Sequence, residues 1–287
     1  MNNTESNNCT QEQEKISLRG EAQKEHDPKK EFITIFNKLA YKHSAYNIFD
    51  DFVNMSAIAM SNAIAFDKDR EEQYLSIVGK YSKEEVKLFP ALYTQVVLGL
   101  EAGFCDFLGD IYMELGIGNA RAGQFFTPYH LCKLMSQMTF NGKLNEHGYI
   151  EVSEPACGCG GMIISLVETM LEHDINPQQT LFAECTDIDR TVAMACYVQL
   201  SLLHIPAKVI VGNALSLEVR DVFYTPSYAL GFWNLKLSKK RKNESEIIVK
   251  DLPANTYNSF EEKQSEEPEI VFPVKKETKI IQFDLFD

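Results

Sequence analysis

The hydrophobic pattern changes character along the chain. Between about residues 31 and 115, apolar residues recur three and four positions apart, which is typical of amphipathic helices. After Gly148, short apolar runs alternate with helical stretches, and the pattern predicts strands over 149–156, 180–188, 208–215 and 220–224 and helices over 162–173 and 190–204. Strands and helices in alternation indicate βαβ units, so we expect a parallel sheet with helices on its faces.

These changes predict four parts. Residues 1–30 are polar, with almost no apolar side chains, and are expected to be disordered. A helical domain is expected over 31–115, and an α/β domain over 116–237. Residues 238–287 contain three prolines and no sustained period, so we expect a mostly disordered tail.

The charge balance limits the partners. There are 28 basic and 41 acidic residues, which give a net charge of −13. This argues against a protein that grips nucleic acid with its whole surface, because neutralising phosphates needs an excess of Lys and Arg. The dense basic run at Lys236 and 239–242 could still meet DNA phosphates, although a solvated linker is the simpler interpretation.

The composition also bears on the compartment. No apolar run reaches the roughly 18 residues of a membrane span. The first fifteen residues have neither the basic start nor the apolar stretch of a signal peptide. The seven Cys are scattered and odd in number, which favours reduced thiols. We therefore expect a cytoplasmic protein without a membrane contact.

Polar groups follow three successive predicted strands. The first strand leads into Glu154 and the Gly-rich run 154–161 (EPACGCGG), where backbone N–H groups could face a negatively charged ligand. The second ends at Asp187, a position that often binds ribose hydroxyls, whereas Asp189 fits a helix N-cap better. The third ends at Asn213, which could bond an adenine ring or simply form a turn. Together these groups favour an adenosyl pocket.

The motifs GQFFTP (123–128), EPACGCGG and DID (187–189), in this order, resemble the modification subunit of type I restriction systems and related adenine-N6 DNA methyltransferases. The resemblance covers about residues 31–228 and implies a Rossmann-like methyltransferase domain that binds S-adenosyl-L-methionine behind a helical domain. It implies that Phe126 and Thr127 hold the methionine end. The remaining implied contacts to the cofactor are Glu154, Ala156, Gly158 and Gly160 for the amino and carboxylate groups, Asp187 for the ribose, Ile188 for an adenine face and Asn213 for the adenine edge.

The family places Asn or Asp, two prolines and an aromatic residue after its fourth strand, where they bind the target adenine. The best match here is Thr225, Pro226, Ser227 and Tyr228. Thr225 and Pro226 would form the catalytic turn and Tyr228 would stack on the flipped base. Thr225 offers one hydroxyl where the family has an amide or carboxylate, so this motif is degenerate, and TPSY could also be an ordinary turn.

Other candidate residues have simpler interpretations. Cys157 and Cys159 lack a second pair at zinc-site spacing, so no metal site is expected, and small buried side chains are the commoner role. His130 follows a proline at an expected helix start and is predicted to be structural.

The C-terminal QFDLF resembles the peptide that docks bacterial proteins on the sliding clamp. Gln282, Leu285 and Phe286 would then bind the clamp, unless residues 280–286 form a strand that folds back onto the domain.

The overall prediction is a site-specific DNA adenine-N6 methyltransferase of a restriction-modification type, or a subunit of one. After residue 237 the sequence shows no second folded region that could recognise a target, so DNA specificity would come from a partner specificity subunit. The alternative is a catalytically impaired protein that keeps the cofactor pocket and docks on DNA machinery.

Overall fold

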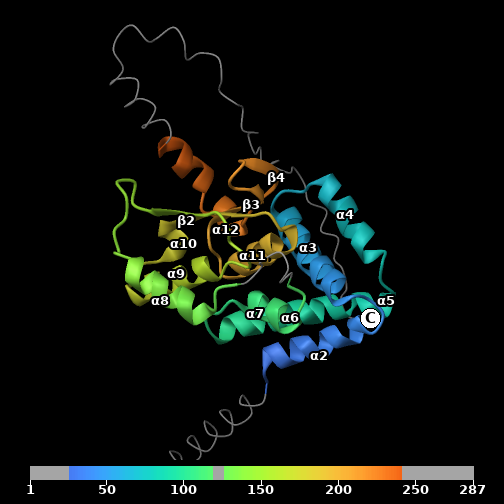
Figure 1. Ribbon diagram of the computed structural model, residues 1–287. Helices are drawn as coiled ribbons and strands as arrows, with labels where there is room; N and C mark the ends of the chain where they lie inside the picture. Colours follow the sequence, from blue (N-terminus) through green and yellow to red (C-terminus); the bar gives the residue numbers. More distant parts are fainter. Residues whose placement is uncertain (1–25, 119–125, 241–287) are drawn as a thin grey trace, which may run out of the picture.

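The computed structural model describes residues 26–118 and 126–240, and Figure 1 shows their arrangement. The first part is helical, as the sequence predicts. Its helices are α2 (Pro28–Ala40), α3 (Ala45–Ile64), α4 (Lys68–Val78), α5 (Lys83–Val86), α6 (Leu88–Ala102) and α7 (Phe107–Glu114). The second described range begins at residue 126, and helix α8 (Tyr129–Thr139) lies near its start, before the first strand of the sheet.

Polar side chains fix where several helices begin. Asp27 accepts hydrogen bonds from the backbone N–H groups of Lys29 and Lys30, and Pro28 occupies the first turn of α2, where its missing N–H costs nothing. Ser82 and Glu85 form a capping box at α5. Helix α2 therefore begins inside the segment 1–30 that the composition predicts to be disordered.

The sheet contains four strands in the order β1-β2-β3-β4. β1 (Ile150–Glu154), β2 (Leu181–Asp187) and β3 (Ala207–Asn213) are parallel, and the helices between them are α9 (Gly161–Glu172), α10 (Pro177–Thr180) and α11 (Arg190–Leu202). These elements confirm the predicted strand and helix alternation and the α/β fold class.

The fourth strand runs in the opposite direction. β4 (Glu218–Tyr224) pairs antiparallel with β3, so that Asn213 lies opposite Glu218 and Lys208 lies opposite Tyr224. The chain turns back directly after β3 in a short hairpin, which needs no crossover helix. The expectation of a fourth strand in a parallel sheet is therefore wrong, and β4 ends at the end of the sheet where β1, β2 and β3 begin.

One hydrophobic core joins the helical part to the sheet. Buried side chains of α2, α3, α6 and α7 form a single cluster with those of α9, α11 and the strands. Phe32 and Phe107 pack edge to face with their ring centroids 6.1 Å apart, and α3 runs along α11 (Figure 1). The predicted division at residues 115 and 116 stays a prediction, but the core is continuous across it.

A charged network fastens β4 to the helices. Asp221 of β4 accepts hydrogen bonds from Arg70 of α4 at 3.0 Å and from Arg190 of α11 at 2.7 Å. The Arg70 guanidinium also lies over the Phe223 ring, 3.8 Å from its centroid. Asn54 of α3 accepts from Arg190 Nε at 2.9 Å. The hairpin is thus bonded directly to α4 and α11, and Arg190 links this network to α3.

A smaller cluster covers the other face of the sheet. Trp233, which is fully buried, packs on Phe182 of β2 and edge to face on Tyr149. It belongs to a helical segment over 233–240 that follows α12 (Pro226–Leu230). At the end of this segment Lys240 forms an ion pair with Glu151 of β1.

Candidate functional site

The Gly-rich turn between β1 and α9 has a backbone that requires glycine. Gly160 has φ +100°, and a Cβ there would lie 3.0 Å from the Cys196 sulfur, so any side chain would be strained. Gly160 is also the N-cap of α9, and no side chain caps this helix. The first N–H groups of α9 therefore lie at the turn without a capping side chain, as in sites that bind anionic groups.

Asp187 holds the turn from the end of β2. One carboxylate oxygen accepts a hydrogen bond from the Gly158 N–H at 2.9 Å, and the other accepts from the Asp189 N–H at 2.9 Å. Burial raises the pKa of Asp187. Ile188 beside it is 61% exposed, and its carbonyl accepts a hydrogen bond from Arg220. A half-buried carboxylate and an exposed apolar side chain thus lie next to each other.

Glu154 and Asn213 lie at the same end of the sheet as Asp187. The register aligns Glu154 with Cys185 in β2 and Asp187 with Val211 in β3, so the three strands end near one another. The Glu154 carboxylate accepts from the Ala156 N–H at 3.2 Å. The Asn213 side-chain oxygen accepts from the Leu215 N–H at 2.9 Å, which makes it the turn residue the sequence also allows. Among the described residues, no acceptor bonds its amide N–H₂ group.

The segment before α8 covers the turn. Phe126 lies against Gly158 and stacks on Tyr112 of α7, with 5.4 Å between ring centroids. Thr127 is exposed beside them. Phe126, Thr127, the turn and α9 surround a cavity of about 80 Å³, lined by Asp106, Phe126, Thr127, Cys132, Ala156, Cys157, Gly158, Cys159, Gly161 and Met162. Gly123, Gln124 and Phe125 of the predicted motif lie outside the described residues.

Asp106 is a residue of this cavity that the sequence analysis did not single out. It caps α7 and is 6% exposed. Its Oδ1 accepts hydrogen bonds from the Gly109 N–H at 3.0 Å and from Gln199 Nε2 at 2.8 Å. Burial raises the pKa of Asp106 to about 6. In the sequence, Asp before a helix indicates a cap, and nothing there shows that the helix begins at a cavity.

The predicted catalytic turn does not lie at this site. Thr225 follows β4 and therefore lies at the opposite end of the sheet, beside the start of β3. It is fully buried, donates to the Ile205 carbonyl at 2.7 Å and accepts from the Ala207 N–H at 2.9 Å. Its hydroxyl stabilises the entry to β3, so the prediction that it polarises a target adenine beside the cofactor turn is wrong.

Pro226 and Tyr228, the other two residues of the predicted catalytic turn, also have structural positions. Pro226 is the first residue of α12, a position that suits its fixed φ. Tyr228 is 8% exposed and packs against Phe182 and Tyr224, with ring centroids 5.8 Å and 4.6 Å away. A ring buried in this cluster is not a free stacking platform for a flipped base.

The two cysteines of the turn, Cys157 and Cys159, are buried, and His130 lies on the surface. The contact with Cys185 and burial raise the pKa of Cys157, and burial raises the pKa of Cys159, so neither is a ready nucleophile. Within the described ranges, no group of three or more His, Cys, Asp or Glu side chains is placed to hold a metal ion. His130 is exposed in the first turn of α8.

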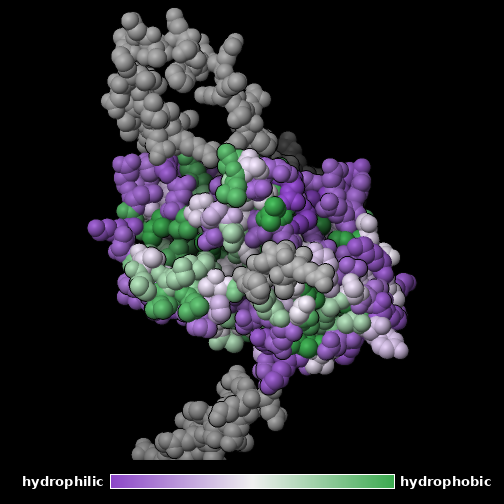
Figure 2. Space-filling model, in the orientation of Figure 1, coloured by the Kyte–Doolittle hydropathy of each residue, from purple (hydrophilic) through white to green (hydrophobic). Residues whose placement is uncertain are grey.

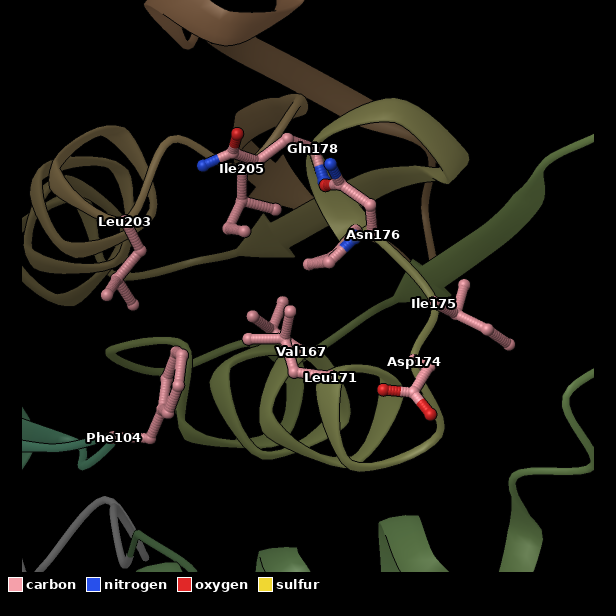
Figure 3. Close-up of a pocket in the computed structure, with 10 residues that line it drawn as sticks. Phe104, Val167, Leu171, Asp174, Ile175, Asn176, Gln178, Leu203 and Ile205 are labelled. Atoms are coloured by element: carbon pink, nitrogen blue, oxygen red, sulfur yellow. The ribbon is translucent and has the colours of Figure 1, made fainter.

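A larger cavity, of about 440 Å³, lies at the opposite end of the sheet (Figure 3). Asp174, Asn176 and Gln178 supply its polar groups, while Val167 and Ile205 line its apolar part. It contains none of the predicted site residues. We therefore assign the candidate site to the smaller cavity and the strand ends beside it.

Two predicted contact regions lie mostly beyond the described chain. In the basic run, Lys236 lies over the Trp233 ring at 4.0 Å and Lys240 pairs with Glu151, so both contact the protein itself. Arg241, Lys242 and the tail residues Gln282, Leu285 and Phe286 are outside the described residues. The sliding-clamp contact stays a prediction.

Helix α8 exposes large apolar side chains. Leu131, Leu134 and Met135 are each close to half exposed, and Met138 is 78% exposed. Figure 2 shows hydrophobic side chains on this part of the surface. None of the helices in the described part of the chain combines the length and the apolarity needed to cross a membrane.

Comparison with solved structures finds distant similarities. One is described as a class I S-adenosylmethionine-dependent methyltransferase from Listeria monocytogenes, with 11% identity and a TM-score of 0.35, over 63% of this chain and 51% of that one. Another is the methyltransferase subunit of a type I restriction-modification system from Streptococcus thermophilus, with 14% identity and a TM-score of 0.32, over 62% of this chain and 56% of that one. The chain spans about half the length of these structures.

Among curated proteins, none matches this sequence. A family model does match, and it is described as N-6 DNA methylase. The match covers residues 105–276, which is more than half of the chain and includes Asp106, the FFTP segment, the Gly-rich turn and all four strands. The chain therefore belongs to the N-6 DNA methylase family.

Proposed function

We propose that the chain binds S-adenosylmethionine at the carboxyl end of its parallel strands and takes part in the N6 methylation of adenine in DNA. Membership of the N-6 DNA methylase family supports the reaction class. The observation that carries the cofactor assignment is the bonding of Asp187 to the Gly158 N–H, which places a carboxylate and a glycine turn side by side. This is the arrangement that nucleoside-binding α/β folds use.

The residues at this end of the sheet fit such a cofactor. Asp187 would bind the ribose hydroxyls through the lone pairs that its two backbone donors leave open. The exposed Ile188 side chain would lie against an adenine face, and the Asn213 amide N–H₂ would donate to the adenine edge. A cavity of about 80 Å³ suits only a small part of the molecule, so the adenosyl part would lie in the open beside the strand ends.

The methionine end would enter the small cavity. Phe126 and Thr127 would cover it from one side, and the backbone from Ala156 to Gly160 would line the other. Glu154 bonds the Ala156 N–H and so fixes the start of this backbone. When bound, S-adenosylmethionine supplies an electrophilic methyl group, and these residues orient it and exclude water from the amino-acid end.

The target adenine would be bound by groups other than the TPSY turn, because that turn lies at the opposite end of the sheet. We assign sequence specificity to a partner subunit. The apolar side chains exposed along α8, directly after Thr127, support a partner contact near the cofactor, since exposed apolar groups on one helix face commonly mark an interface.

A second candidate function is favoured by the position of Thr225. A protein that keeps the cofactor site but lacks its own base-binding turn would act as a cofactor-dependent binding subunit without methyl transfer. Both candidates need the same cofactor site, and they differ in whether methyl groups reach DNA.

Calorimetry tests the cofactor site. Wild-type protein titrated with S-adenosylmethionine should bind with micromolar-class affinity, which is about −8 kcal/mol at 1 μM. Asp187→Ala should weaken binding, because the ribose and the turn both lose a charged acceptor. The control Asp69→Ala changes an exposed carboxylate of α4 far along the chain and should bind like wild type. No heat and no thermal stabilisation with wild type would refute the proposal.

Methyl transfer separates the two candidate functions. Transfer of tritium from labelled cofactor to unmethylated DNA should be measured with the chain alone and with the products of neighbouring genes. If tritium appears at adenine N6 only when a partner is added, the result supports the proposal that the chain is a methyltransferase subunit. A chain that binds cofactor but transfers no label with any partner supports the binding subunit.

A further inference from the structure

We infer that Asp106 binds the ammonium group at the amino-acid end of the cofactor. The inference rests on the proposed function and assigns a role to a residue from the helical part of the chain. It follows from the burial of this carboxylate, the bonding of one of its oxygens and the position of the other.

One carboxylate oxygen of Asp106, Oδ1, accepts two hydrogen bonds from groups of the protein. Oδ1 accepts from the Gly109 N–H and from Gln199 Nε2, and the same Gln199 nitrogen donates to the Cys159 carbonyl of the Gly-rich turn at 2.7 Å. Gln199 Oε1 accepts from the Leu108 N–H at 3.0 Å. The carboxylate is therefore held in one orientation relative to the turn by a side chain that is itself completely buried.

The other oxygen, Oδ2, lies between the start of α7 and the start of α9. Oδ2 lies 2.2 Å from the position that a Cβ on Gly109 would take and 3.0 Å from that of a Cβ on Gly161, so glycines in α7 and at the start of α9 leave room for it. In the part of the chain that the structure describes, no donor forms a hydrogen bond with Oδ2, although the side chain is more than nine-tenths buried. Asp106 and Gly161 both line the cavity of about 80 Å³ between Thr127 and the turn.

A cationic ligand group accounts for these features. A buried carboxylate with one oxygen lacking a donor is costly unless a cation or a donor reaches it. The charge of Asp110 also acts on it, and because this side chain is acidic too it adds to the cost. An ammonium group offers both a charge and three donors, and the cofactor's methionine end carries one. Its neighbouring carboxylate would meet the uncapped N–H groups of α9.

The test compares two ligands that differ only in the amino-acid end. S-adenosylhomocysteine carries the ammonium and carboxylate groups, whereas 5′-methylthioadenosine carries neither. The variant Asp106→Asn keeps an acceptor for Gly109 and Gln199 but replaces Oδ2 with an N–H₂ group that repels an ammonium. Calorimetry should show ~10–100-fold weaker binding of S-adenosylhomocysteine and an unchanged affinity for methylthioadenosine. Asp110→Asn, on the exposed side of α7, should bind both ligands like wild type.

The outcomes separate this inference from the proposed function. If wild type and Asp106→Asn bind S-adenosylhomocysteine equally, Asp106 does not contact the ammonium group. If the variant loses affinity for both ligands by the same factor, its role is to support the turn, and the inference is overturned while the cofactor site stands. If wild type binds neither ligand, the proposed function fails and the inference fails with it. Thermal unfolding of the variant, measured in parallel, confirms that it is folded.

Discussion

Replacing Asp106 by Asn should make the ligand-free protein more stable at neutral pH, because the change removes a buried charge and preserves the shape of the side chain. Asn retains the carbonyl oxygen that accepts from the Gly109 N–H and from Gln199. It also remains a good N-cap for α7. The main difference between the two proteins is then the free energy of ionising a carboxyl group in the interior.

The pKa of Asp106 sets the magnitude. Burial raises it from 3.8 to about 6 in the folded protein. A carboxyl group whose pKa is higher in the folded state favours folding when it is protonated, so it lowers the stability as the pH rises from about 4 through 6. With about 1.4 kcal/mol for each unit, the cost of the charge reaches about 3 kcal/mol above pH 7 and accumulates mainly between pH 4 and 6.

Urea unfolding followed by circular dichroism, at pH values from 4.5 to 8, measures this effect. The free energy of unfolding of Asp106→Asn, minus that of wild type, should increase by about 2 kcal/mol over this range and should be constant above about pH 7. The control Asp110→Asn should show no comparable rise, because that carboxylate is half exposed and paired with Lys29. A difference that does not depend on pH would refute the assignment of a raised pKa to Asp106.

Three further substitutions test the site and the sheet. Gly160→Ala should lower the free energy of unfolding in urea by about 1–3 kcal/mol, because Ala at φ +100° is strained and its Cβ meets the Cys196 sulfur; a neutral result would contradict the turn geometry. Thr225→Val should cost about 1–3 kcal/mol in the same assay but leave cofactor affinity in calorimetry unchanged, and a selective loss of affinity would restore a role at the ligand. Trp233→Ala should cost about 3–5 kcal/mol, since its ring fills the cluster on Phe182, and a cost below 1 kcal/mol would show that the segment over 233–240 is not packed there.

The elements of this fold were predictable because their sequence signals are local. A strand, a Gly-rich turn and a helix follow one another over 149–173, and each has its own period or turn residues. The strand-end positions of Glu154, Asp187 and Asn213 follow once the strands are parallel, because parallel strands end on the same side. The family match over 105–276 agrees with the resemblance that the motifs indicate.

The direction of β4 could not be predicted in the same way. A run such as VRDVFY has the same alternation whether it pairs parallel or antiparallel. The direction is decided by the connection from Asn213 to Glu218, which is too short for a crossover helix and is closed by hydrogen bonds that the Leu215 and Ser216 N–H groups donate to the Asn213 side chain. Expecting the fourth strand to be parallel moved Thr225 and Tyr228 to the wrong end of the sheet.

The role of Asp106 was hidden for a different reason. Its sequence context, an acidic residue before FLGDIYMEL, indicates only a helix cap. Its burial depends on Gln199, which is 93 residues away, and on the glycine that begins α9. Contacts between residues so far apart in the sequence depend on the tertiary structure, and no local sequence pattern predicts them.

Because the small cavity is lined both by Asp106, the N-cap of α7, with Phe126 and by the turn of the sheet, a ligand bound there should slow the opening of helices as well as strands. Hydrogen exchange would detect this as coordinated protection of backbone amides in 107–114 and 157–164. At a ligand concentration of about one hundred times the Kd, openings that abolish binding become about 2.7 kcal/mol more costly. The helical part and the sheet would then respond to the cofactor as one cooperative unit, and the N-terminal helices would become resistant to proteolysis when the sheet is occupied.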